Sequence, residues 1–187
     1  MSEPSQAQQA YYQFCSLYVH SVIEWNAAEE VAFDLLEALS PPGLGPTLAI
    51  RQLKSVPLKD TLALMAKALR ISENQVGAEH LEHFVEGFDR LRAYRNFYVH
   101  CIRAVAQTNE TSAELHSLEV KGNLSLVTHR LTNTELSAFC RSTMQLAHYG
   151  RSIEPFISAD SPSLPASPQK PTWPDKLKKT RDNLLTR

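Results

Sequence analysis

A basic and polar cluster lies inside an otherwise apolar stretch of the sequence. Residues 94–101 read YRNFYVHC, in which Arg95, Asn96 and His100 stand among aromatic and aliphatic side chains. Arginine keeps its positive charge and presents a planar fork of donors to phosphate oxygens. Histidine titrates near neutral pH, so it can accept or release a proton during a reaction. These residue types are suited to cleaving or binding a phosphodiester, and neither task needs a metal ion or another cofactor.

The surrounding residues 77–107 predict one long helix that places this cluster on a basic face. Between Gly87 and Asn109 the only acid is Asp89, and four arginines lie there: Arg90, Arg92, Arg95 and Arg103. At about 100° per residue, the arginines at 92, 95 and 103 share one broad polar arc with Asn96 and His100. The apolar side chains gather on the opposite arc. Such a face is typical of an anion site or of a surface that binds a partner. The non-functional alternative is an ordinary solvated helix face.

The spacing Arg95-x4-His100, with asparagine directly after the arginine, resembles the R-x(4–6)-H signature of the HEPN superfamily (higher eukaryotes and prokaryotes nucleotide-binding). Members of this superfamily are helical bundles and often metal-independent endoribonucleases. The resemblance implies that Arg95 and His100 are the catalytic pair and that Asn96 orients His100 or the phosphate. Arg92 and Arg103 are then expected to bind the substrate. Because Arg95 and His100 diverge by about 140° on a regular helix, a single target must lie between them or the helix must distort.

The same resemblance implies partners. RNA is the expected substrate, and the bundle is expected to form a homodimer in which two motifs face each other across a cleft. Phe88 and Val99 fall within the polar arc, and packing between two copies would explain them. A toxin-like or defence-related role, with an antitoxin or regulatory protein, belongs to the same expectation. Some members carry a tyrosine, modified by a partner nucleotidyltransferase, two positions after the histidine, but Ile102 stands there in this sequence.

A non-catalytic module that binds a nucleic acid, a nucleotide or a protein through the same arginines is the alternative to an endoribonuclease. Other candidate sites are weaker. His80 and His83 lie one turn apart, but no second Glu-x-x-His element completes a di-iron site, so a solvated first turn is expected there. His20 and Glu24 predict a local contact between helix positions i and i+4. We expect His116 and His129 on a hairpin surface, and no motif of a nucleophilic hydrolase is present.

The elements around the motif predict a mainly α fold, a HEPN-like bundle of four to five helices with a small β-hairpin before the last helix. Residues 10–39 repeat apolar positions every three and four residues, and the sequence SPPGLGP ends that helix. A short helical piece, broken near Pro57, precedes a helix over 58–71. Apolar and polar residues roughly alternate over 113–131, with glycine 122 in the turn, and this pattern predicts the hairpin. Thr132 and Glu135 have capping-box spacing at the start of the last helix, which Pro155 is expected to end.

Composition separates the chain into two parts. Residues 1–157 are predicted to form the helical domain, and residues 158–187 a flexible tail rich in proline and serine with a basic end. The last dozen residues are expected to be a nascent helix. A formal net charge of -1 gives no general attraction for nucleic acid, so binding would depend on the local basic face. Three widely spaced cysteines, and the lack of a signal-like start or a long apolar run, predict a cytoplasmic protein without a membrane segment.

Overall fold

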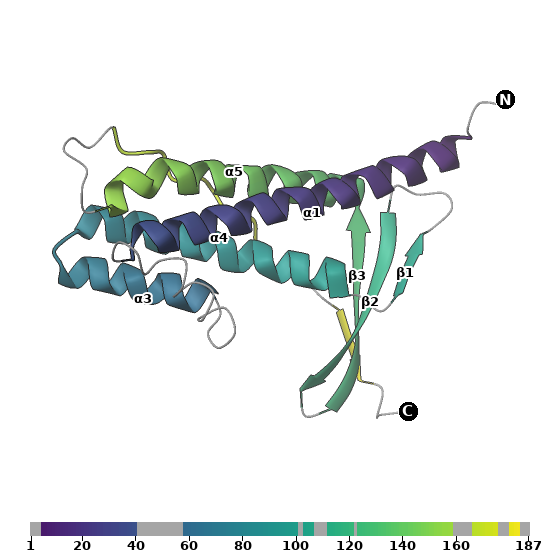
Figure 1. The fold of residues 1–187 in the computed structure, drawn as a ribbon. Helices are drawn as coiled ribbons and strands as arrows, with labels where there is room; N and C mark the ends of the chain where they lie inside the picture. Colours follow the sequence, from purple (N-terminus) through teal and green to yellow (C-terminus); the bar gives the residue numbers. More distant parts are fainter. Residues whose placement is uncertain are drawn as a thin grey trace.

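The computed structural model describes residues 5–40, 58–100, 103–106, 112–121, 123–158, 166–175 and 180–183. This part contains the helices α1 (Gln6–Ala38), α3 (Leu58–Ile71), α4 (Gln75–His100) and α5 (Asn133–Ile157). It also contains the strands β1 (Arg103–Ala106), β2 (Ser112–Lys121), β3 (Asn123–Thr132) and β4 (Thr180–Asn183). The helices lie side by side with the sheet across one end of them (Figure 1). The prediction of a mainly helical bundle is confirmed.

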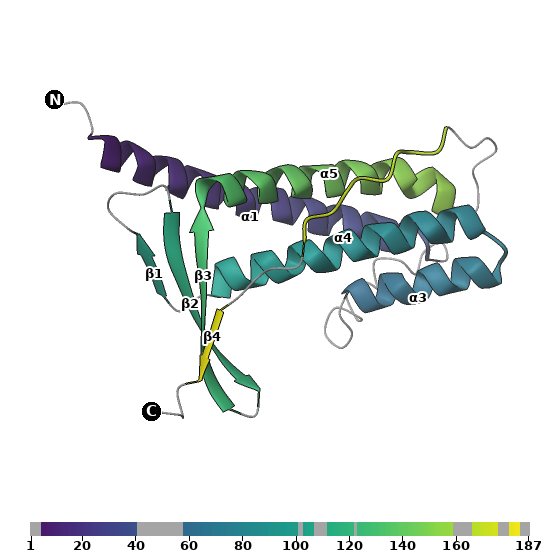
Figure 2. The ribbon, with the colours of Figure 1, turned by 180° about the vertical axis from the view of Figure 1, so that it is seen from behind.

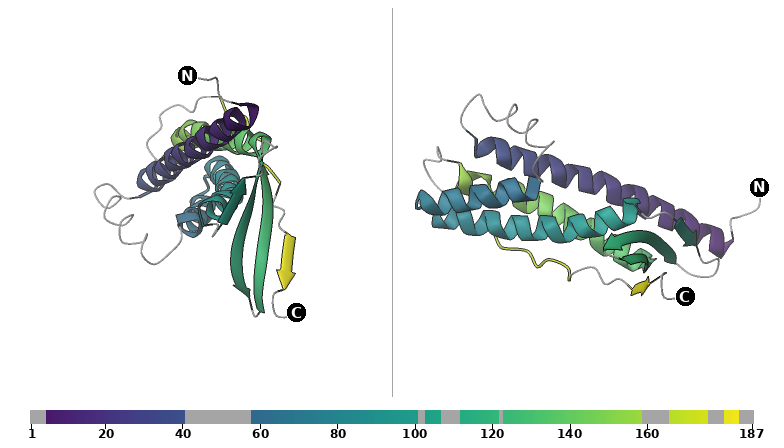
Figure 3. Two further views of the ribbon diagram at one scale, coloured as in Figure 1. Left: turned by 90° about the vertical axis from the view of Figure 1, so that its right-hand side faces the viewer. Right: turned by 90° about the horizontal axis from the view of Figure 1, so that it is seen from below.

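The bundle has two layers, with α1 beside α5 in one and α3 beside α4 in the other (Figure 3). Helix α4 runs opposite to the other three (Figure 1). Trp25 of α1 is fully buried against Phe88 of α4, with ring centroids 5.1 Å apart. Gly150 lets α5 approach both α1 and α4 closely, because a Cβ at this position would press on Val31 of α1 and Phe84 of α4. The core is therefore made where α1, α4 and α5 meet.

Two of the predicted helix boundaries agree closely with the structure. Helix α3 spans the predicted residues 58–71, and α5 begins after Thr132, whose capping box with Glu135 is formed. Helix α5 includes Pro155 in its last turn and ends at Ile157, slightly later than predicted. Residues 41–57, where the short helical piece was expected, lie outside the described residues.

Helix α4 is shorter than the sequence predicts, since it ends at His100 and residues 103–106 form strand β1. Arg103 in β1 pairs with His116 of β2, and the other three β1 residues continue this antiparallel register. A short apolar run fits either a helix or a strand, and here pairing with the following strand β2 decides. Arg103 consequently does not share a helix face with Arg95 and His100, which corrects the predicted basic arc.

The predicted hairpin is formed by β2 and β3, which pair from Ser112 with Thr132 to Lys121 with Asn123. The turn residue at 122 lies outside the described residues. Strands β1 and β4 extend the hairpin to a four-stranded sheet in the order β1-β2-β3-β4. Val127 and Leu131 of β3 are fully buried, and His129 lies between them on the same face. His129 therefore faces inward, which corrects its expected place on the hairpin surface.

Residues 166–175, here called the C-terminal segment, run alongside α4 and α5 without helix or strand structure (Figure 2). Trp173 in this segment is only 7% exposed, and its indole nitrogen donates a hydrogen bond of 2.9 Å to the carbonyl oxygen of His83. Farther along, β4 pairs with residues 125–128 of β3. The chain beyond residue 158 thus contributes to the fold in both described stretches, where a flexible tail and a nascent helix were predicted.

Replacing Thr132 by alanine is expected to lower the free energy of unfolding by about 1 kcal/mol. The Thr132 hydroxyl accepts a 3.1 Å hydrogen bond from the Glu135 amide, and the Glu135 carboxylate accepts one of 3.0 Å from the Thr132 amide. Alanine leaves the Glu135 amide at the helix start without this acceptor. Urea unfolding followed by circular dichroism measures the change, with Thr132→Ser as the variant that keeps the cap. Equal stability of the alanine variant and wild type would contradict this role for the cap.

Candidate functional site

The candidate site is the last part of α4, where the sequence RNFYVH ends the helix beside the sheet. Phe97 and Tyr98 point inward and are buried, whereas Asn96 and His100 are exposed. The last four carbonyl groups of a helix have no partner within it. One of them, the Tyr98 carbonyl, accepts a 2.8 Å hydrogen bond from the hydroxyl of Tyr18. Helix α1 thereby fixes the end of α4, and with it the position of His100.

Arg95 lies between the core and the surface. It follows Phe88 by seven residues, so the two side chains leave α4 on nearly the same side. The Arg95 Nε atom is buried and has no hydrogen-bond partner among the residues that the structure describes, and the Nη1 atom donates to the Asn96 side-chain oxygen at 3.2 Å. Phe88 packs on Trp25 within the same chain, so it needs no second copy to cover it. This corrects its assignment to the polar arc.

The other arginines described on α3 and α4 are paired with carboxylates. Arg70 contacts Glu82 at 2.6 Å, and Arg90 pairs with Glu86. The predicted substrate ligand Arg92 lies 2.9 Å from Asp89, whose carboxylate is also 2.9 Å from the Lys59 ammonium. Burial acts to raise the pKa of Asp89, but the hydrogen bonds from Lys59 and Arg92 outweigh it, so the pKa lies below its ordinary value. Among these arginines, Arg95 alone has no carboxylate partner in the described structure.

Arg95 and His100 are not brought together within one chain. Helix α4 is a regular α-helix up to His100, so the two Cα positions differ by about 140° in direction and about 7.5 Å along the axis. The structure joins Arg95 to Asn96, whereas His100 is the exposed last residue of the helix. Arg103, the other predicted substrate ligand, lies in β1, and its side chain is outside the described part. A phosphate that contacts both Arg95 and His100 must therefore lie between them, or the two must come from different copies.

The structure places one further histidine near this end of α4. The ring of His129 lies edge-on to Phe97, with centroids 5.8 Å apart, and stacks on Tyr98 at 6.4 Å. Its Nε2 atom is 3.7 Å from a carboxylate oxygen of Glu135. The alternation of Val127, His129 and Leu131 was the signal that could have placed His129 inside, because strand residues two apart share a face.

His80 is buried, although a solvated helix turn was expected at this position. Its Nδ1 atom lies 2.8 Å from the Tyr149 hydroxyl and its Nε2 atom 2.9 Å from the Ser167 hydroxyl. Ser167 belongs to the C-terminal segment and is 87 residues away in the sequence, which is why the sequence pattern did not reveal the contact. The predicted local contact between His20 and Glu24 is formed at 3.3 Å. No group of three or more His, Cys, Asp or Glu side chains within the described ranges could hold a metal ion.

The stability of the fold is expected to fall as the pH drops below about 6.5, the ordinary pKa of histidine. Burial, and then the charge of Lys170, lower the pKa of His80 in the folded chain. Below pH 6.5 the unfolded chain binds a proton at this residue more readily than the folded chain, so the folded state loses stability until the folded pKa is passed. Above pH 7.5 this contribution to the pH dependence vanishes.

The measurement compares the thermal midpoints of wild type and His80→Gln at pH 7.5 and pH 5.5. The glutamine variant is expected to lose less stability between the two values, because position 80 no longer titrates. Other histidines affect both proteins alike, so the difference between the two losses of thermal midpoint isolates the effect of His80. Equal losses in the two proteins would contradict the lowered pKa of His80.

Comparisons with known proteins return no matching family model, no matching curated protein and no matching solved structure. In the described ranges, no helix combines the length and the apolar character that crossing a membrane requires. A functional interpretation therefore rests on the residues at the end of α4 and on their geometry.

Proposed function

We propose that the chain is a homodimeric, metal-independent endoribonuclease of the HEPN type that acts in the cytoplasm on RNA phosphodiesters. Arg95 would bind the phosphate, His100 would transfer a proton, and Asn96 would hold the Arg95 guanidinium in place. One observation carries the proposal: within the described residues Arg95 has no carboxylate partner, whereas Arg70, Arg90 and Arg92 each have one. A guanidinium that no acid neutralises is available for an anion, and phosphate matches its planar fork of donors.

The proposed reaction uses the 2′-hydroxyl of the RNA as its nucleophile. This oxygen attacks the adjacent phosphorus while a base accepts its proton, and the bond from phosphorus to the 5′-oxygen breaks. An acid returns a proton to the departing 5′-oxygen, which leaves a 2′,3′-cyclic phosphate and a free 5′-hydroxyl. A histidine can fill either role near neutral pH, so His100 from each of two copies would serve as base and acid. Arg95 would stabilise the negative charge that grows on the phosphate oxygens.

A dimer would resolve the divergence of Arg95 and His100 on one helix, because Arg95 of one copy could meet His100 of another. Val99 lies next to His100 and is 39% exposed although it is aliphatic. Replacing Val99 by aspartate is expected to weaken self-association at least about tenfold in sedimentation experiments, since a charge would enter an apolar contact. Ile71→Asp is the control. Ile71 is 85% exposed and is the last residue of α3, at the end of the bundle away from His100. An unchanged mass distribution for Val99→Asp would reject this placement of the interface.

The test of activity is incubation of the purified protein with mixed RNA in the presence of a chelator. We expect cleavage products that end in a 2′,3′-cyclic phosphate, identified by their resistance to phosphatase until the cyclic ester is opened by acid. Cleavage that appears only after a divalent metal is added, or intact RNA with folded wild-type protein, would reject the proposed chemistry.

A non-catalytic RNA-binding module is the second candidate, and the divergence of Arg95 and His100 within one chain favours it. In that case the protein would bind RNA without cutting it. Arg95→Ala would weaken binding and reduce its salt dependence, because one phosphate contact would be lost. His100→Ala would leave the affinity nearly unchanged. The same RNA incubation therefore separates the two candidates.

A further inference from the structure

The C-terminal segment binds one face of α4 in the manner of a peptide ligand. Five α4 residues, spaced alternately by three and four positions, contact it in order and are called the α4 stripe: His80, His83, Gly87, Arg90 and Tyr94. This spacing keeps all five on one side of the helix. The segment follows the same direction as α4 along this stripe (Figure 3). The α4 stripe is on a different side of the helix from Asn96 and His100, which lie about 160° and about 120° away from its centre, respectively.

Most of the polar contacts along the α4 stripe are directed at main-chain carbonyl oxygens of the segment. The Nε2 atom of His83 donates to the Pro171 carbonyl at 2.8 Å, and Arg90 donates to the Pro174 carbonyl at 3.0 Å. The Tyr94 hydroxyl donates to the Asp175 carbonyl at 2.9 Å. Proline offers a carbonyl acceptor but no amide donor. The donors of the α4 stripe therefore complement a proline-rich backbone.

The segment is extended along α4. From His80 to Tyr94 the helix axis rises by about 21 Å. The eight residue-to-residue steps from Ser167 to Asp175 cover the same length, about 2.6 Å per step, which approaches the 3.1 Å rise of a polyproline II helix. Recognition of such a backbone by aromatic and donor side chains is a common mode of peptide binding.

Trp173 is the anchor of the segment. It is 7% exposed, and its ring stacks on His83 with centroids 5.1 Å apart. It lies directly over Gly87, where any Cβ would collide with the indole ring. The residues around the anchor, among them Gln169, Lys170 and Thr172, are exposed. One buried aromatic anchor with exposed neighbours is the pattern of a peptide interface rather than of a protein core.

We propose that the α4 stripe is a recognition site for proline-rich segments with the pattern Pro-x-Trp-Pro, occupied here by Pro171–Pro174 of the same chain. A partner protein with such a segment displaces the C-terminal segment and takes its place. The tethered segment has a local concentration in the millimolar range, so it competes strongly with a free peptide. Weakening the tethered segment without changing the α4 stripe must therefore expose the site.

The test uses full-length protein and a fluorescein-labelled peptide of residues 166–175, ASPQKPTWPD, in fluorescence anisotropy. The variant Trp173→Ala removes the tethered anchor and is expected to bind the peptide at least about tenfold more tightly than wild type. A peptide with alanine in place of its tryptophan is expected not to bind. Adding Gly87→Leu to Trp173→Ala fills the space that the indole ring of Trp173 occupies in the wild type, and it is expected to abolish peptide binding.

Two controls accompany this test. Far-UV circular dichroism confirms the helices of each variant, and Tyr94→Phe is expected to leave peptide binding nearly unchanged, because the tethered segment and the free peptide lose the same hydrogen bond to the α4 stripe. Equal affinity of wild type and Trp173→Ala would overturn the proposal, as would equal binding of the two peptides. Loss of self-association in Trp173→Ala without any gain in peptide binding would also overturn it, because the segment would then be exchanged between copies. This test measures peptide binding and not RNA cleavage, so its outcome is independent of the proposed ribonuclease function.

Discussion

Replacing His100 by alanine is expected to lower the rate of RNA cleavage by a factor of at least about 100, the lower end of what a positioned acid or base contributes. The same loss is expected for Arg95→Ala, because removal of a group that stabilises transition-state charge commonly has an effect of about 100-fold to 1,000-fold. Both rates are measured under single-turnover conditions in a chelator. Single turnover separates the chemical step from product release.

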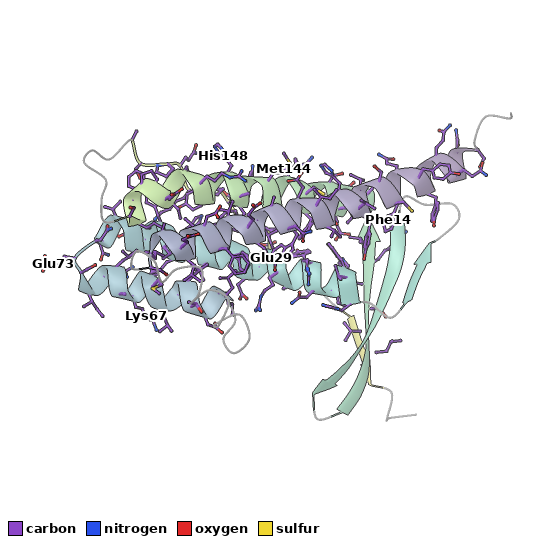
Figure 4. All side chains as sticks on the ribbon, viewed as in Figure 1. Phe14, Glu29, Lys67, Glu73, Met144 and His148 are labelled. Carbon is purple, nitrogen blue, oxygen red and sulfur yellow. The ribbon has the colours of Figure 1, made fainter. Side chains whose placement is uncertain are left out.

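Matched variants on α5 control for loss of charge and for general effects of substitution. His148 is an exposed histidine on the outer side of α5, near Met144 (Figure 4), and Arg151 is an exposed arginine on the same helix. His148→Ala and Arg151→Ala are expected to cleave at the wild-type rate. Arg95→Lys keeps the charge but loses the planar fork, so it is expected to recover only part of the activity. Equal rates for wild type, His100→Ala and Arg95→Ala would remove both residues from the catalytic machinery.

Replacing Trp25 by alanine is expected to lower the free energy of unfolding by about 3–5 kcal/mol. Trp25 is fully buried where α1 packs on α4, and its ring contacts Phe88, two turns before Arg95. Alanine would leave a cavity at the junction of the two layers, since the helices can close around it only partly. Urea unfolding followed by circular dichroism measures the difference, and the slope of the transition checks that the same surface is exposed in both proteins.

Two further variants test this explanation. The Trp25 indole nitrogen is buried without a hydrogen-bond partner in the described part of the chain, so Trp25→Phe removes an unsatisfied donor together with part of the side-chain volume. This variant is therefore expected to lose much less stability than Trp25→Ala. Ile71→Ala, at an 85% exposed position, is expected to change stability by no more than about 0.5 kcal/mol. A loss below 1 kcal/mol for Trp25→Ala would show that the contact between α1 and α4 contributes little.

The sequence alone determined the elements that depend on neighbours along the chain. The helix over 58–71 was predicted from its apolar period, and the start of α5 from the reciprocal hydrogen bonds of Thr132 and Glu135. The alternation of apolar and polar residues within β2 and within β3 predicted the hairpin. Each of these signals involves residues a few positions apart, so the amino-acid order is sufficient to show it. The motif RNFYVH was visible for the same reason, and its assignment as a ribonuclease site stays a prediction.

Only the tertiary structure decided features that depend on contacts between different elements, some of which are far apart in the sequence. Residues 103–106 form a strand rather than the end of α4 because β2 is beside them to pair with. Arg92 is neutralised by Asp89 together with Lys59 of another helix, whereas Arg95 keeps no carboxylate partner in the described structure. His80 and Trp173 are buried because the C-terminal segment returns to α4 from about 90 residues away, as the separation of 90 between Trp173 and His83 illustrates. Helical period and composition describe one element at a time, and they carry no information about which distant segment will cover its faces.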